Sequence, residues 1–151
     1  MPAEQRIDFD RCEGVSSNPA NASAQDTVLV VEDEVFIRMV ISDYLRSCGY
    51  KVIEAASADE ALTVLQHLEV NVDVVFSDIE MPGSMDGFAL STWTRANRPG
   101  LEVILAGSVP RAAKAAAKLC DSGPVPKPYE PQAVVDRIRR LIGARARRKR
   151  A

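Results

Sequence analysis

The sequence predicts an α/β fold with a doubly wound, parallel sheet of five strands alternating with five helices. From Thr27 onward, short apolar runs alternate with segments whose apolar residues recur at helical spacing. Such alternation is typical of βαβ units, whose right-handed crossovers place helices on both faces of a parallel sheet. Several of the apolar runs end directly in charged residues, where an open α/β sheet forms its crevice. A chain of 151 residues suits one such domain with its own core.

The first part of the pattern predicts three strands and two helices. The strands are Val28–Val31, Lys51–Glu54 and Val72–Ser77. Gly49 ends the first helix, and either Ser57 or Asp59 caps the second. The apolar stripe of the first helix contains Ile37, Val40, Ile41, Tyr44 and Leu45, and that of the second contains Ala61, Val64, Leu65 and Leu68.

The second part of the pattern predicts two further strands, Glu102–Ala106 and a short one at Val125. A loop from Met81 to Gly87 leads into a helix from about Phe88 to Ala96, which Arg-Pro-Gly at 98–100 ends. A small alanine-rich helix is expected over 111–120. The last helix starts at about Pro131, a residue suited to the first turn, and its apolar face holds Val134, Val135, Ile138, Leu141 and Ile142.

The chain divides into an arm, a domain and a tail. Residues 1–25 lack periodicity and are predicted to be a disordered arm, 26–142 form the domain, and 143–151 are a basic tail. The tail carries a charge of +5 and the rest carries −7, which together give the net charge of −2. About nine residues after the last helix are too few for an output domain. Five basic residues can bind nucleic acid non-specifically, but no aromatic platform or reading helix accompanies them, so nucleic-acid binding is not expected.

Membrane insertion and secretion are not expected either. No apolar stretch reaches the roughly 18 to 20 residues that cross a bilayer. The N-terminal residues Met1–Gln5 lack the basic and apolar regions of a signal peptide. A cytoplasmic location is therefore expected.

Charged residues at three predicted strand ends point to one chemistry. Glu32 and Asp33 follow the first strand, Asp78 follows the third and Lys127 follows the fifth. Because the carboxyl ends of parallel strands share one edge of the sheet, these side chains are expected to meet. Carboxylate oxygens are suitable ligands for a divalent metal ion, and the charge of a lysine can pair with a phosphoryl oxygen. The pattern indicates metal-assisted phosphoryl transfer with Asp78 as the nucleophile.

Three segments carry a resemblance to a known family. They are Val30-Val31-Glu32-Asp33-Glu34, then Ser77-Asp78-Ile79-Glu80-Met81-Pro82-Gly83-Ser84-Met85-Asp86-Gly87, and then Lys127-Pro128-Tyr129. In this order and spacing they resemble the receiver domain of two-component response regulators, which has the flavodoxin-like fold of the chemotaxis response regulator. The resemblance covers about Thr27 to Ile142. It implies a (βα)5 sheet with strand order 2-1-3-4-5.

The resemblance also implies a role for each residue. Asp78 would accept a phosphoryl group from a histidine kinase or a histidine phosphotransfer protein, and Lys127 would contact that group. Glu32, Asp33, Asp78 and the backbone carbonyl of Glu80 would hold Mg²⁺ or Mn²⁺. The Lys127-Pro128 bond is a candidate cis peptide. Such a domain signals or relays phosphate to a downstream protein target and is not a turnover enzyme.

Two positions depart from the family pattern. Receivers usually have Thr or Ser at the end of the fourth strand, where this chain has Ala106. They often have Tyr or Phe three residues before the lysine, where this chain has Pro124. Ala106 lacks a hydroxyl, so one charge-assisted hydrogen bond of roughly 1.5 to 3 kcal/mol is missing from the phosphorylated state. Ser108 is a candidate substitute. The hypothesis is that Asp78 is phosphorylated while the switch is weak, different or absent.

Other interpretations of these residues remain open. The chain could be a receiver-like module that binds a protein without phosphorylation, which Ala106 and Pro124 favour. A haloacid-type phosphatase fits poorly, because the chain has Asp78-Ile79-Glu80 in place of Asp-x-Asp and no lid domain. Asp86 and Gly87 are interpreted as a helix-start turn, and Tyr129 as a residue that packs beneath the loop.

Overall fold

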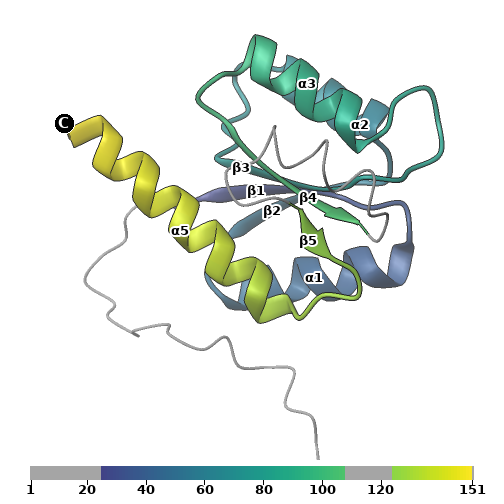
Figure 1. The fold of residues 1–151 in the computed structure, drawn as a ribbon, viewed down its shortest axis with the longest axis horizontal. Coiled ribbons are helices and arrows are strands. Elements are labelled where there is room, and N and C mark those ends of the chain that lie inside the picture. Colours follow the sequence, from purple (N-terminus) through teal and green to yellow (C-terminus); the bar gives the residue numbers. More distant parts are fainter. Residues whose placement is uncertain (1–24, 108–123, 151) are drawn as a thin grey trace, which may run out of the picture.

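The structure, a computed structural model, describes residues 25–107 and 124–150 and contains one five-stranded parallel sheet (Figure 1). Its order is β2-β1-β3-β4-β5, as the resemblance implied. The strands pair in register, with Val31 opposite Ser77 and Asp78 opposite Ala106. Their bounds are β1 Thr27–Val31, β2 Lys51–Ala55, β3 Val74–Asp78, β4 Glu102–Gly107 and β5 Val125–Pro126.

Helices cover both faces of this sheet. α1 (Val35–Ser47) and α5 (Pro131–Arg150) lie on one face, and α2 (Ala58–Gln66) and α3 (Gly87–Asn97) lie on the other (Figure 1). Successive strand residues point to opposite faces. In β1, Val28 and Val30 pack in the core under α1 and α5, while Leu29 and Val31 pack in the core under α2 and α3. Burial on both faces explains why β1 and β3 are continuous apolar runs.

Polar residues define the helix starts as the sequence suggested. The Ser57 hydroxyl accepts a hydrogen bond from the Glu60 backbone N–H at 3.1 Å, which makes Ser57 the cap of α2. Asp86 caps α3 through the Ala89 N–H at 2.8 Å. These caps satisfy N–H groups that have no partner inside the helix.

Some expected features differ or lie outside the described residues. The predicted core position of Leu68 is wrong: α2 ends at Gln66, so Leu68 leaves the helical stripe and is 76% exposed. β3 starts two residues later than predicted and extends to include Asp78. The predicted helix over 111–120, the candidate Ser108 and residues 1–24 of the predicted arm lie outside the described residues.

The last helix is longer than predicted. It was expected to end near Ile142, but α5 continues to Arg150. Alanine and arginine favour helix in this segment. Arg145 Nη1 lies 3.6 Å from Asp73 Oδ1, and Arg148 Nη2 lies 2.7 Å from Glu102 Oε1. These ion pairs connect the basic segment to Asp73, which directly precedes β3, and to Glu102, the first residue of β4. No helix in the described part of the chain is long and apolar enough to cross a membrane.

Candidate functional site

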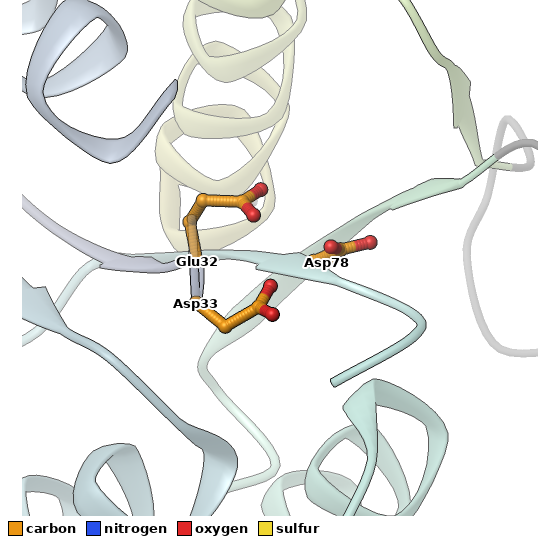
Figure 2. A group of neighbouring side chains, drawn as sticks. All are labelled: Glu32, Asp33 and Asp78. Carbon is orange, nitrogen blue, oxygen red and sulfur yellow. The ribbon is translucent and has the colours of Figure 1, made fainter. Parts of the chain in front are cut away.

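The three predicted acids meet at the carboxyl ends of adjacent strands. Glu32 and Asp33 follow β1, and Asp78 is the last residue of β3 (Figure 2). One carboxylate oxygen from each residue lies within 4.8 Å of the others. Glu32 and Asp78 are buried, with 2% and 7% exposure, whereas Asp33 is exposed to solvent. The strand register explains this geometry, because Val31 and Ser77 are paired and each is followed directly by an acid.

Lys127 brings a positive charge into this cluster. It follows β5, and its Nζ lies 2.8 Å from Asp78 Oδ2 and 3.1 Å from Glu32 Oε2. Burial acts to lower the pKa of Lys127, but its hydrogen bonds to Asp78 and Glu32 outweigh burial and raise the pKa above its ordinary value. The lysine therefore stays protonated and is not an ordinary loop residue. The predicted cis Lys127-Pro128 peptide is confirmed.

Glu32 has a hydrogen-bond partner at each carboxylate oxygen. Its Oε1 accepts from the Glu34 backbone N–H at 3.2 Å, and its Oε2 accepts from Lys127. Burial raises the pKa of Glu32, and the charge of Asp78 adds to this, while the Glu34 N–H and Lys127 act in the opposite direction. The side chain is thereby fixed in place before any ligand binds.

Gly87 lies against the backbone of Asp78, a role that its sequence context does not indicate. Its N–H donates to the Ile79 carbonyl at 2.9 Å, at the first residue of α3. A Cβ at this position would overlap the backbone carbonyl oxygen of Asp78 and lie 2.9 Å from the Asp78 carbonyl carbon. Only glycine allows α3 to approach the end of β3 this closely. The helix-start turn was predicted, but no local sequence signal reveals this contact.

Glu80 follows β3, while the two atypical positions, Ala106 and Pro124, lie near the end of β4 and just before β5. Glu80 is exposed and lines an open pocket beside Asp86. Ala106 is buried in β4, between Asp78 of β3 and Val125 of β5 in the strand register. Pro124 is half-buried and directly precedes β5.

Tyr129 packs beneath the site, as predicted. Its ring meets Phe76 edge to face, with centroids 5.3 Å apart and planes at 88°. Burial, with a smaller contribution from the charges of Glu32 and Asp78, raises the pKa of the Tyr129 hydroxyl far above its ordinary range. Tyr129 therefore stays neutral and supports the core below the acids.

The donor set of the cluster fits Mg²⁺ or Mn²⁺. Its three carboxylates are hard oxygen ligands from residues that already converge. Three carboxylates against one ammonium leave a formal charge of −2, which a divalent cation balances.

Comparisons with known proteins find similar sequences. The family model of the response regulator receiver domain matches residues 28–139. The chain is 36% identical over 122 residues to the sensor kinase CckA of Brucella abortus, which covers 80% of this chain and 13% of that protein. It is 37% identical over 116 residues to the response regulator FleR of Pseudomonas aeruginosa, and this match covers 75% of this chain and 24% of FleR. The transcriptional regulatory protein ResD of Bacillus subtilis is 30% identical over 116 residues, and this match covers 76% of this chain and 47% of ResD. The chain thus spans less than half the length of each of these relatives.

Solved structures show the same fold. A response regulator receiver domain protein from Clostridium thermocellum superposes with a TM-score of 0.72 at 25% identity, covering 80% of this chain and 97% of that one. The response regulator TrrA of Thermotoga maritima, solved in complex with Mg²⁺-BeF, has a TM-score of 0.69 at 26% identity. This match covers 78% of this chain and 99% of the TrrA chain.

Proposed function

The chain belongs to the response regulator receiver domain family, and we propose that it accepts a phosphoryl group on Asp78 from a histidine kinase or a histidine phosphotransfer protein. It then signals, or passes the phosphate on, through contacts with a downstream protein. The observation that supports this most is the convergence of Lys127 with three carboxylates at the strand ends. This convergence gives no support to the alternative of a module that binds without phosphorylation.

The proposed transfer is an in-line displacement at phosphorus. The Asp78 carboxylate attacks the phosphorus of phosphohistidine, and a P–O bond forms as the P–N bond breaks. The electron pair of the broken bond goes to the imidazole nitrogen, which takes up a proton from water. Lys127 moves from the free carboxylates to a phosphoryl oxygen, where its raised pKa keeps it charged.

Glu32, Asp33, Asp78 and the Glu80 backbone carbonyl are proposed to hold Mg²⁺. When bound, the ion neutralises charge on the phosphoryl oxygens. Glu32 and Asp78 keep their positions through strand ends that are buried and paired. Without a divalent ion, the cluster's excess negative charge would repel a phosphoryl group.

The proposed function predicts phosphorylation that depends on a metal. With acetyl phosphate and Mg²⁺, the purified chain is expected to gain one phosphoryl group by intact mass. Removal of Mg²⁺ with EDTA is expected to abolish the gain, because the negative charge of the cluster is then uncompensated. A gain that EDTA leaves unchanged, or no gain at any Mg²⁺ concentration, would contradict the proposal.

An apolar groove beside the site is proposed to receive the phosphodonor protein. The first half of α1 exposes Val35, Phe36, Met39 and Val40, between 47% and 74% each. Phe36 and Val40 line a groove with Lys127, Pro128 and Pro131. A donor seated there lies next to the lysine that contacts Asp78. We therefore infer that the occupant is the protein that carries the phosphohistidine.

Phe36→Ser is expected to separate docking from chemistry. Transfer from a purified phosphorylated histidine phosphotransfer domain should fall by about 30-fold, the loss of roughly 2 kcal/mol expected for an interface anchor. The rate with acetyl phosphate should not change, because Phe36 is 74% exposed and is not a member of the cluster of acids and lysine. Leu68→Ser is the matched control, since Leu68 lies two residues after the end of α2, is 76% exposed and does not line the groove. Equal losses with both donors would rule out a docking role.

The missing hydroxyl at Ala106 limits the proposed output. The usual hydrogen bond from this position to the phosphoryl group cannot form, so the response is proposed to use other contacts. A cytoplasmic location, where such phosphodonors act, is part of the same proposal.

A further inference from the structure

Arg38, in the first turns of α1, reaches back to the acidic cluster. Its Nη1 donates to the backbone carbonyl of Glu32 at 2.8 Å. Its Nε lies 3.5 Å from Oε1 of Glu54 in β2, and its side chain is only 18% exposed. Glu54 therefore orients the Arg38 guanidinium through Nε. The Nη1 of the same guanidinium binds the peptide bond between Glu32 and Asp33.

With the contact from Arg38, Glu32 is held at its backbone as well as at its carboxylate. The Glu32 N–H donates to the Ala55 carbonyl at 3.1 Å, and its carboxylate accepts from Glu34 and Lys127. The remaining polar group, its carbonyl, is the one that Arg38 binds. Each polar group of Glu32 thus has a partner.

The same peptide determines where Asp33 lies. The carbonyl of Glu32 and the N–H of Asp33 belong to one planar unit, so fixing the carbonyl fixes the direction in which the chain leaves β1. Asp33 itself is exposed. In the part of the chain that the structure describes, no hydrogen bond or ion pair holds its carboxylate. The position of the Asp33 side chain therefore depends on its backbone.

We propose that Arg38 is a positioning residue for the metal site: it holds the Glu32–Asp33 peptide so that the carboxylates of Glu32, Asp33 and Asp78 converge before Mg²⁺ binds. This inference rests on the proposed function in that the cluster takes Mg²⁺. A role through charge alone has the opposite sign, because removing a cation near three carboxylates would strengthen Mg²⁺ binding. The direction of the change therefore distinguishes positioning from charge.

The test is calorimetric titration of the unphosphorylated chain with Mg²⁺. Arg38→Met keeps most of the apolar stem and removes the donor. Its Kd for Mg²⁺ is expected to rise about tenfold, the effect of one lost hydrogen bond from a charged donor. At saturating Mg²⁺ the maximal rate of phosphorylation by acetyl phosphate should return to within about twofold of wild type, because Arg38 does not touch the reacting atoms. Arg38→Lys keeps a donor and a charge, so its Kd for Mg²⁺ should lie between those of the wild type and Arg38→Met. This variant tests the proposal if Arg38→Met does not fold.

Arg46→Met is the matched control. Arg46 is also on α1 and also pairs with Glu54, at 3.0 Å, but it makes no contact with Glu32. The Kd of the Arg46→Met variant for Mg²⁺ is expected to equal that of the wild type. An unchanged or lower Kd in Arg38→Met and Arg38→Lys would overturn the positioning role alone. A wild-type chain that binds no Mg²⁺ would overturn the proposed function and this inference with it.

Discussion

Asp78→Asn is expected to abolish phosphorylation by acetyl phosphate at every Mg²⁺ concentration. A neutral amide is not a nucleophile toward phosphorus under these conditions, and the substitution also removes a charged oxygen from the cluster. The amide is nearly the same size as the carboxylate, and Lys127 keeps its hydrogen bond to Glu32 at 3.1 Å. The fold should therefore survive while the chemistry is lost.

Intact mass and hydroxylamine treatment measure this outcome. The wild-type product should be lost in hydroxylamine, as expected of an acyl phosphate, and Asp78→Asn should form none. Asp73→Asn is the matched control, because Asp73 lies just before β3, at the opposite end from Asp78. It should be phosphorylated like the wild type. A hydroxylamine-stable phosphate in Asp78→Asn, for example on the neighbouring Ser77, would show that Asp78 is not the sole acceptor.

Gly87→Ala is expected to destabilise the fold by about 3 kcal/mol, the upper part of the range for overpacking a rigid site. The added Cβ would overlap the Asp78 carbonyl oxygen. That obstacle is backbone at the end of a paired, buried strand, so it cannot move aside as a flexible side chain would. Relief of the overlap shifts either α3 or Asp78, and phosphorylation by acetyl phosphate should slow in parallel.

Urea unfolding compares this variant with Gly143→Ala. Gly143 lies inside α5, and a Cβ there would meet only Arg147 Nη1, at an ordinary 3.7 Å. Gly143→Ala should stabilise the chain by about 0.5 to 1 kcal/mol, the helix preference of alanine over glycine. A Gly87→Ala variant as stable as wild type would mean that α3 does not need this close approach.

Most strands and helices of the described core, and the members of the acidic cluster, could be predicted from the sequence. Both depend on local information. Continuous apolar runs such as 28–31 predict strands buried on both faces, and helical spacing predicts α1. Once the strands are parallel, their carboxyl ends must share an edge. Glu32, Asp33, Asp78 and Lys127 could therefore be assigned to one site before any distance was known.

Features that depend on distances between separate elements could not be predicted from the sequence and are visible only in the folded structure. α5 extends beyond Ile142 with Arg145 and Arg148 paired to acids that precede or begin β3 and β4, far away in sequence. Leu68 leaves the core because α2 ends before it. The sequence indicates only a turn at Gly87, whereas in the structure a Cβ on this residue would overlap the backbone carbonyl of Asp78. Arg38 is outside the predicted apolar stripe of α1, and its contact with Glu32 could not be predicted, because periodicity reports which face is apolar and not which backbone atom a side chain reaches.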